Sequence, residues 1–246
     1  MNKTLHIAAS ATAATLIAIT ASCGNKQVTA SADSESLATV ELSWADSITA
    51  NNCTAKSSAA AQYPSEGSHA LLDSTRSWIA QCLTTIMPVD TAAASASFPA
   101  SLLADGEKLI ADAGTRFLTE ARTDFDSFDP ADGFRLNYEY QAEVNKTFDT
   151  DSVVTFTAST YIYTGGAHGA TLFNAATFRT SDGAALGYDI FEQDNLPELT
   201  QMVKDAVAKQ YFETGDDFKM EDALIIDPQD FRLPSTPPYF TKDGLS

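Results

Sequence analysis

This chain of 246 residues contains few side chains of the types that act as catalytic groups. After the N-terminal segment only His69 and His168 remain as histidines, and neither has a partner at metal-ligand spacing. His168 stands alone among glycines, in Gly165-Gly166-Ala167-His168-Gly169. Since imidazole titrates near neutrality, His168 is the one candidate for acid–base work. The alternative, which we favour, is that His168 hydrogen-bonds the backbone of its own turn.

Aromatic residues flank this glycine stretch, and they make it a candidate binding surface. Glycine is needed where backbone turns sharply or approaches another group closely. No helix follows the stretch directly, so it lacks the helix N-terminus of a phosphate-binding loop. We therefore expect a ligand other than a phosphate, and no cofactor or metal ion. The predicted ligand-binding residues are Tyr161, Tyr163, Gly165, Gly166, His168 and Phe173.

The net charge of the chain indicates which classes of macromolecule it can bind. The formal net charge is -18, and no basic stretch suited to a phosphate backbone is visible. A nucleic acid is therefore excluded as a partner, and an anionic membrane surface is disfavoured for the same reason. A cationic protein remains allowed, because an acidic face attracts it. The charge has a simpler alternative explanation, which is solubility.

The N-terminus has the pattern of a bacterial lipoprotein signal peptide. Lys3 is followed by an apolar run over 7–19, which is too short to span a membrane, and then by Thr20-Ala21-Ser22-Cys23. This pattern predicts a signal peptide over 1–22, lipidation of Cys23 and a polar tether over 23–37. The alternative is a plain secreted protein. The protein is thus expected in the cell envelope, anchored by lipid in the outer membrane, facing the periplasm or the cell surface.

Two further cysteines, Cys53 and Cys82, leave two alternatives open. An envelope location permits a disulfide between them. Cys82 also falls on the apolar face of a predicted helix, where a buried free thiol is equally at home.

Hydrophobic periodicity predicts an α+β fold. Alternating patterns indicate strands over 40–44, 134–148, 153–163, 171–178 and 186–191, joined by turns that favour an antiparallel meander. In the strand over 134–148, Gln141 and Glu143 fall on the polar face. Three amphipathic helices are expected. Ser65 or Ser68 caps the first, Ser101 begins the second and Asn195 caps the third, which has an apolar stripe expected to be buried.

The glycine stretch and its surroundings resemble the RsiV-like family of envelope domains of unknown function. The resemblance rests on Tyr163-Thr164-Gly165-Gly166-Ala167-His168-Gly169, on the turn Asp182-Gly183 and on Phe240-Thr241-Lys242-Asp243-Gly244-Leu245. Upstream, Tyr63-Pro64 and the helix containing Trp78 resemble the PdaC-like companion domain that precedes it. The resemblance implies an α+β fold with antiparallel sheet. It also implies further strands after Ser246, in keeping with a chain that stops just after a hairpin turn.

These observations predict an N-terminal α+β companion domain over 38–132 and an RsiV-like domain over 133–246. The anti-sigma factor that names the family binds lysozyme, and other members accompany a polysaccharide deacetylase. Neither a sigma-binding segment nor a catalytic deacetylase domain is recognisable in this chain. We therefore expect a lipid-anchored binding module for a cationic protein such as lysozyme, or for a glycan. The alternatives are an envelope hydrolase using His168 and a structural envelope lipoprotein.

Overall fold

The computed structural model describes residues 37–84, 98–127, 135–211, 230–234 and 236–246. The predicted signal peptide, Cys23 and the tether up to residue 36 lie outside these residues. No helix within the described part is long and apolar enough to cross a membrane.

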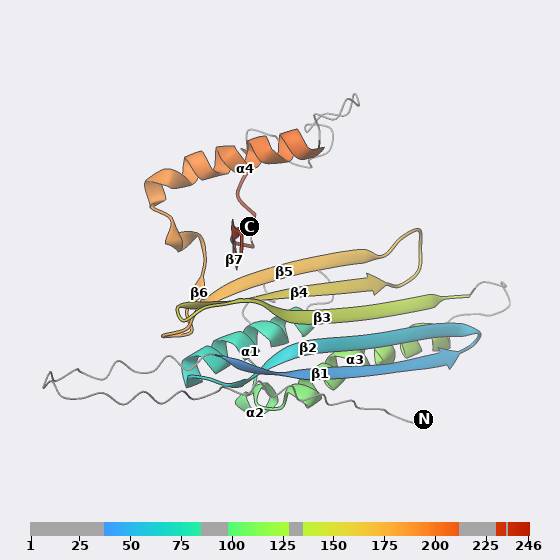
Figure 1. Cartoon of the computed structure of the whole chain (residues 1–246). Helices are drawn as coiled ribbons and strands as arrows, with labels where there is room; N and C mark the ends of the chain where they lie inside the picture. The colour runs from blue at the N-terminus through green and yellow to red at the C-terminus, as the bar shows by residue number, and fades with distance from the viewer. Residues whose placement is uncertain (1–36, 85–97, 128–134, 212–229, 235) are drawn as a thin grey trace, which may run out of the picture.

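Six strands form one sheet in the order β1-β2-β3-β4-β5-β6 (Figure 1). Every neighbouring pair is antiparallel except β2 and β3, which run parallel. A separate small hairpin near the C-terminus pairs β7 with β8. The strands are β1 Ala38–Ala50, β2 Cys53–Glu66, β3 Asn137–Asp149, β4 Val153–Tyr163, β5 Ala170–Arg179, β6 Ala185–Leu186, β7 Phe240–Thr241 and β8 Gly244–Leu245.

Two helices, α1 (His69–Thr84) and α3 (Gly106–Ser127), cover one face of this sheet (Figure 1). A short helix, α2 (Ala100–Leu103), precedes α3, and α4 (Leu196–Tyr211) stands apart from the sheet. Two 3-10 turns, η3 (Tyr188–Ile190) and η4 (Gln193–Asn195), connect β6 to α4. The predicted α+β class and the antiparallel meander from β3 to β6 are confirmed.

Local sequence explains the first hairpin. Asn51 and Asn52 both have positive φ, 49° and 62°, as the two central residues of a type I′ turn require. Asparagine tolerates this conformation better than most residues, and the turn's twist matches that of the paired strands. The turn therefore fixes the register of β1 against β2 as far as the pair Thr39 and Pro64, beyond which the register shifts by one residue at Ala38.

One hydrophobic core lies between the sheet and the helices. Its largest fully buried side chains include Tyr140, Phe125, Phe156 and Phe178. Residues from both sides of the predicted boundary at residue 132 share this core and the same sheet, because β2 pairs directly with β3. The Tyr140 hydroxyl donates to the Leu83 carbonyl over 3.2 Å and so ties β3 to the end of α1.

The helix predicted from Ser101 is interrupted, which corrects the sequence-based expectation. It ends as α2 and restarts as α3 after Asp105, whose carboxylate accepts from the Lys108 amide at 2.9 Å and caps the new helix. Gly106 follows because a Cβ there would lie 2.6 Å from the Tyr63 ring and 2.7 Å from Leu42. The apolar stripe continues through the break, so periodicity alone does not reveal it.

The strand predicted over 186–191 is also shorter than expected. Only Ala185 and Leu186 pair with β5, and the chain then enters η3. The cause is local, since the Gly187 amide donates to the Asp189 carboxylate over 2.9 Å. This side-chain bond takes a backbone donor that a longer strand would offer to its neighbour.

The apolar stripe of α4, expected to be buried, is largely open. Met202 is 62% exposed, and Leu199, Val203 and Val207 are only half-buried. The helix projects beyond the sheet rather than packing on it (Figure 1), so the core does not reach its apolar face.

Of the two alternatives for the cysteines, the structure has the free thiols. Cys53 and Cys82 are both buried and unpaired with each other. The Cys53 thiol lies 3.6 Å from the Asn51 carbonyl oxygen and 3.4 Å from the Leu136 amide nitrogen. Cys82 packs in the core, near the end of α1.

Buried tyrosine hydroxyls and a buried cysteine thiol make the stability of the fold depend on pH in the alkaline range. Burial raises the pKa of Tyr63 and of Tyr140 from 10.0 to about 12, and that of Cys82 from 9.0 to about 12. A raised pKa means that the folded state keeps a proton which the unfolded state loses. The stability from these groups is therefore complete below about pH 9 and is lost as pH rises towards 12.

We expect the free energy of unfolding to fall steeply between about pH 9 and 12, and less steeply in Tyr140→Phe. Removing the hydroxyl also removes its bond to Leu83, at a cost of about 1 kcal/mol at neutral pH. Urea unfolding at several pH values measures both effects. Equal slopes in the two proteins would contradict the assignment to Tyr140.

Candidate ligand-binding face

The face of the sheet opposite α1 and α3, called here the outer face, carries the candidate site. Because side chains alternate along a strand and the registers are known, the outer face can be read as rows that cross five strands. One row is Ser43, Ala60, Glu143, Ser159 and Phe173, and the next is Ala45, Ser58, Gln141, Tyr161 and Thr171.

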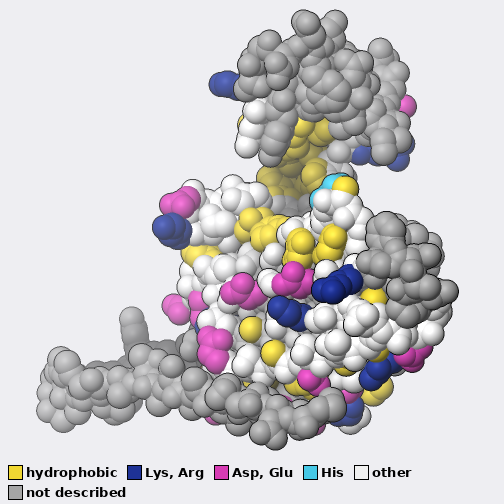
Figure 2. Space-filling view, turned by 90° about the vertical axis from the view of Figure 1, so that its right-hand side faces the viewer, with side chains coloured by type: hydrophobic (Ala, Val, Ile, Leu, Met, Phe, Trp, Pro, Cys, Tyr) yellow, Lys and Arg dark blue, Asp and Glu magenta, His cyan; other side chains and the backbone are white. Residues whose placement is uncertain are grey.

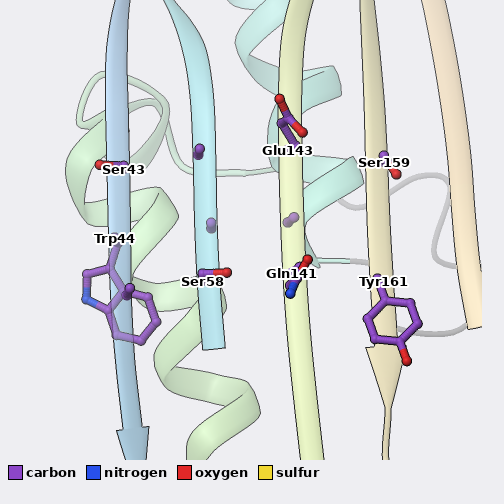
Figure 3. A pocket seen from close by; sticks show the side chains of 11 residues that line it. Ser43, Trp44, Ser58, Gln141, Glu143, Ser159 and Tyr161 are labelled. Atoms are coloured by element: carbon purple, nitrogen blue, oxygen red, sulfur yellow. The ribbon is translucent and has the colours of Figure 1, made fainter. Parts of the chain in front are cut away.

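A groove of about 390 Å³ follows these two rows from β1 to β4 and is called here the outer-face groove. Small side chains on β1 and β2 leave the hollow, while Tyr161 on β4 projects beside it (Figure 3). Trp44 is also at the β1 side of the groove, but its ring lies on the opposite face of the sheet, against Gly114 of α3. The lining residues with polar side chains on the outer face are Ser43, Ser58, Gln141, Glu143, Ser159 and Tyr161.

The glycine stretch positions the two tyrosines of β4. A Cβ on Gly169 would lie 2.5 Å from ring atoms of Tyr161, so only glycine permits this ring to lie across the backbone. The Tyr163 hydroxyl donates to the Gly166 carbonyl over 3.0 Å. Gly165 and Gly166 have positive φ, 92° and 99°, which places the carbonyl within reach of Tyr163. The stretch is therefore a turn that holds aromatic side chains of the outer face.

His168 lies on the surface of that turn. Its Nδ1 is 3.2 Å from the carbonyl oxygen of Gly169, in keeping with the backbone-bonding role that we favoured for it. The side chain is exposed, and no contact of the described residues gives it a carboxylate partner. Nothing in this geometry favours the hydrolase alternative. Within the described part of the chain, no group of three or more His, Cys, Asp or Glu side chains could hold a metal ion.

Carboxylates on the outer face are each held by a neighbouring amide. Gln141 donates to Glu139 over 2.6 Å, and Asn145 donates to Glu143 over 3.0 Å. A carboxylate has about four lone-pair sites, so each of these keeps free acceptors for a ligand. The face therefore combines fixed acceptors, serine hydroxyls and an aromatic ring. This arrangement is suited to binding a hydroxyl-rich or a cationic ligand.

Phe173 belongs to a different hollow. Phe173 is 54% exposed, and the centroid of its ring lies 6.1 Å from that of Tyr239. It lines a second cavity of about 480 Å³, called here the apolar pocket, formed by β5, α4 and the C-terminal segment. Hydrophobic side chains gather in the narrow part of the molecule (Figure 2). Lining residues of the pocket include Tyr188, Leu199, Val203, Pro237 and Tyr239.

The six predicted ligand-binding residues therefore do not form one pocket. Tyr161 lines the outer-face groove, Phe173 lines the apolar pocket, and the other four lie at the end of β4 and in the turn that follows. Whether any of them binds a ligand stays a prediction. Sequence reasoning missed the serines on β1, β2 and β4. It did place Gln141 and Glu143 on the polar face of their strand.

Taken together, the chain is an α+β protein with helices on one face of an open sheet and a polar groove on the other. Residues 80–171, from within α1 to the start of β5, match the model of the family described as Deacetylase PdaC. A solved structure of a DUF3298 family member from Bacteroides fragilis NCTC 9343 has a similar fold. It has a TM-score of 0.51 and 16% identity, and the match covers 70% of this chain and 69% of that chain.

A DUF3298 family protein from Pseudomonas aeruginosa PAO1 is also similar, with a TM-score of 0.40 and 14% identity. That match covers 70% of this chain and 66% of the other. No curated protein matches this chain. The chain thus carries a PdaC-like segment and has the fold of a DUF3298 family structure, while the RsiV-like resemblance stays a prediction.

Proposed function

We propose that this protein is a binding module of the cell envelope, anchored through a lipid on Cys23, and that the outer-face groove holds its ligand. The observation that carries the proposal is the groove itself, which has a floor of small side chains, an aromatic ring beside it and fixed carboxylate acceptors. Binding sites combine such a concave surface with a few placed polar groups.

Two ligand classes fit this chemistry. A glycan can lie with a sugar ring against Tyr161 and give its hydroxyl protons to Glu143 and its neighbours. A cationic protein such as lysozyme can instead be attracted by the chain's net charge of -18. The two differ in salt dependence, because charge attraction between exposed groups weakens as ionic strength rises.

The test is a calorimetric titration of the full chain with hen lysozyme and, separately, with a soluble chitin oligosaccharide, at low and high salt. We expect saturable binding of one of them. Binding of lysozyme that is lost at high salt identifies the protein ligand, and salt-independent binding of the oligosaccharide identifies the glycan. Absence of both at low salt would rule out the two ligand classes named here.

A matched pair of variants locates the binding site. Tyr161→Ala should weaken binding by about tenfold or more, because a central aromatic contact is lost. Phe173→Ala removes another aromatic side chain of the outer face, outside the groove, and should leave affinity unchanged. Equal losses in both variants, with unchanged circular dichroism, would place the ligand elsewhere.

A further inference from the structure

The last long strand of the sheet, β5, has an open edge. On one side it pairs with β4 along its whole length, whereas on the other only Thr177 and Phe178 pair with β6. The segment 170–176 therefore has no strand partner on that side among the described residues. Such an edge presents a row of backbone donors and acceptors.

The backbone groups that face this edge can be named. The Arg179 amide donates to the Ala184 carbonyl and the Arg179 carbonyl accepts from Gly183, so both groups of Arg179 point to the β6 side. Backbone groups in an antiparallel strand alternate between its two neighbours. The amides and carbonyls of Thr171, Phe173 and Ala175 therefore point to that side, and no backbone hydrogen bond from the described residues reaches them. Thr171 and Phe173 are exposed, whereas Ala175 is buried, so the accessible part of the edge is the segment 170–174.

This edge also lacks the usual protection against pairing with another chain. Charged residues, proline and bulges are the common devices. From Ala170 to Phe178 there is no charged residue and no proline. The opposite edge strand, β1, carries Glu41 and Asp46. The two edge strands of the sheet therefore differ in charge, although the net charge of the whole chain is -18.

The open edge lies beside the apolar pocket. Phe173 belongs to both, because its backbone faces the edge and its side chain lines the pocket. Leu199 and Val203 of α4 line the same pocket. In a strand added next to β5, the side chains on the outer face would lie beside Phe173 and so enter this pocket.

We propose that β5 accepts one extended segment of a partner polypeptide, which adds a strand to the sheet and places apolar side chains in the apolar pocket. The unpaired amides and carbonyls require a backbone partner, and the pocket requires a large apolar side chain at alternate positions. A small molecule supplies an apolar group for the pocket but no backbone to pair with β5. A second copy of this chain is disfavoured as the partner because both copies carry a negative net charge. It is also disfavoured because α4, which lines the pocket, limits the space beside β5.

The probe is a synthetic peptide with the sequence of residues 170–178, extended by two lysines at each end and labelled with a fluorophore. It is uncharged in its centre and contains Leu172, Phe173 and Phe178 as large apolar side chains, and antiparallel pairing with β5 brings no like charges together. We expect saturable binding to the full chain by fluorescence anisotropy. Methylating the amide nitrogens of one alternating set should weaken binding about tenfold, whereas methylating the other set should not.

Two variant pairs test the edge and the pocket separately. Thr171→Pro removes an outward amide and should weaken peptide binding, whereas Thr171→Val keeps the amide and should not. Val203→Asp places a charge in the pocket and should weaken binding about tenfold, whereas Met202→Asp, one residue away and outside the pocket, should not. Val203→Asp also keeps the test valid if Thr171→Pro fails to fold.

The proposal is overturned if the unmethylated peptide does not bind, or if both methylated peptides bind equally. It is overturned in favour of a second copy if sedimentation shows that the free chain is a dimer which Thr171→Pro converts to a monomer. It is independent of the outer-face groove, so Tyr161→Ala should leave peptide binding unchanged.

Discussion

Replacing Gly114 with alanine is expected to destabilise the protein by about 2 kcal/mol, although alanine is the better helix former. Gly114 lies inside α3, where alanine would gain up to about 1 kcal/mol from helix propensity. A Cβ there would lie 2.0 Å from Cζ3 of Trp44 and 2.9 Å from Oγ of Ser57. The indole ring must move within a packed layer, and overpacking typically costs about 1–3 kcal/mol and occasionally more.

A double-mutant cycle separates the contact from the helix. In a Trp44→Leu background the ring is absent, so Gly114→Ala should become neutral or stabilising. The control is Thr115→Ala, an exposed position on the same helix, which should change stability by less than about 0.5 kcal/mol. Urea denaturation measures each value. If Gly114→Ala destabilises equally with and without Trp44, the close approach of α3 to β1 is not the reason for the glycine.

The local elements could be predicted because each has its signal nearby in the sequence. Alternation predicted a strand over 153–163, and the structure gives β4 the same bounds. The cap of α1 was predicted as Ser65 or Ser68, and the structure has Ser68, whose hydroxyl accepts from the Leu71 amide over 3.4 Å. Such features depend on interactions within a few residues, which the sequence displays directly.

The parallel pairing of β2 with β3 could not be predicted, and the candidate groove depends on it. The two strands are separated by α1, α2 and α3, so no turn signal joins them. Their register brings Ser58 opposite Gln141 and Ala60 opposite Glu143. The outer-face groove exists only because these distant residues become neighbours. In the sequence, the histidine in the glycine stretch made His168 a candidate site residue. The groove is instead formed by serines and alanines, which have no distinctive pattern in the sequence.

The position of α4 shows a second limit. Its apolar stripe resembles that of a helix packed on a core, and periodicity cannot tell which surface will cover it. In the structure Leu199 and Val203 line the apolar pocket instead. An apolar stripe thus predicts that a helix needs a partner surface, and leaves open whether the chain itself supplies it.

Replacing Gly183 with alanine is expected to cost about 2–4 kcal/mol for two separable reasons. Its φ of +71° strains residues other than glycine, at about 1 kcal/mol or more. A Cβ there would also lie 2.4 Å from the carbonyl oxygen of Ala70, which is backbone in the first turn of α1 and cannot rotate away. The turn between β5 and β6 therefore closes against α1 only with glycine at this position.

Asparagine at residue 183 distinguishes these two causes. Asparagine tolerates positive φ, so Gly183→Asn should recover most of the stability if backbone strain dominates. Its Cβ meets the same Ala70 oxygen, so we expect Gly183→Asn to be nearly as destabilised as Gly183→Ala. Ser181→Ala, exposed in the same turn, is the control and should cost less than about 0.5 kcal/mol. Thermal and urea unfolding of the three variants measure the difference, and a Gly183→Asn protein as stable as the parent would show that the contact with α1 is not limiting.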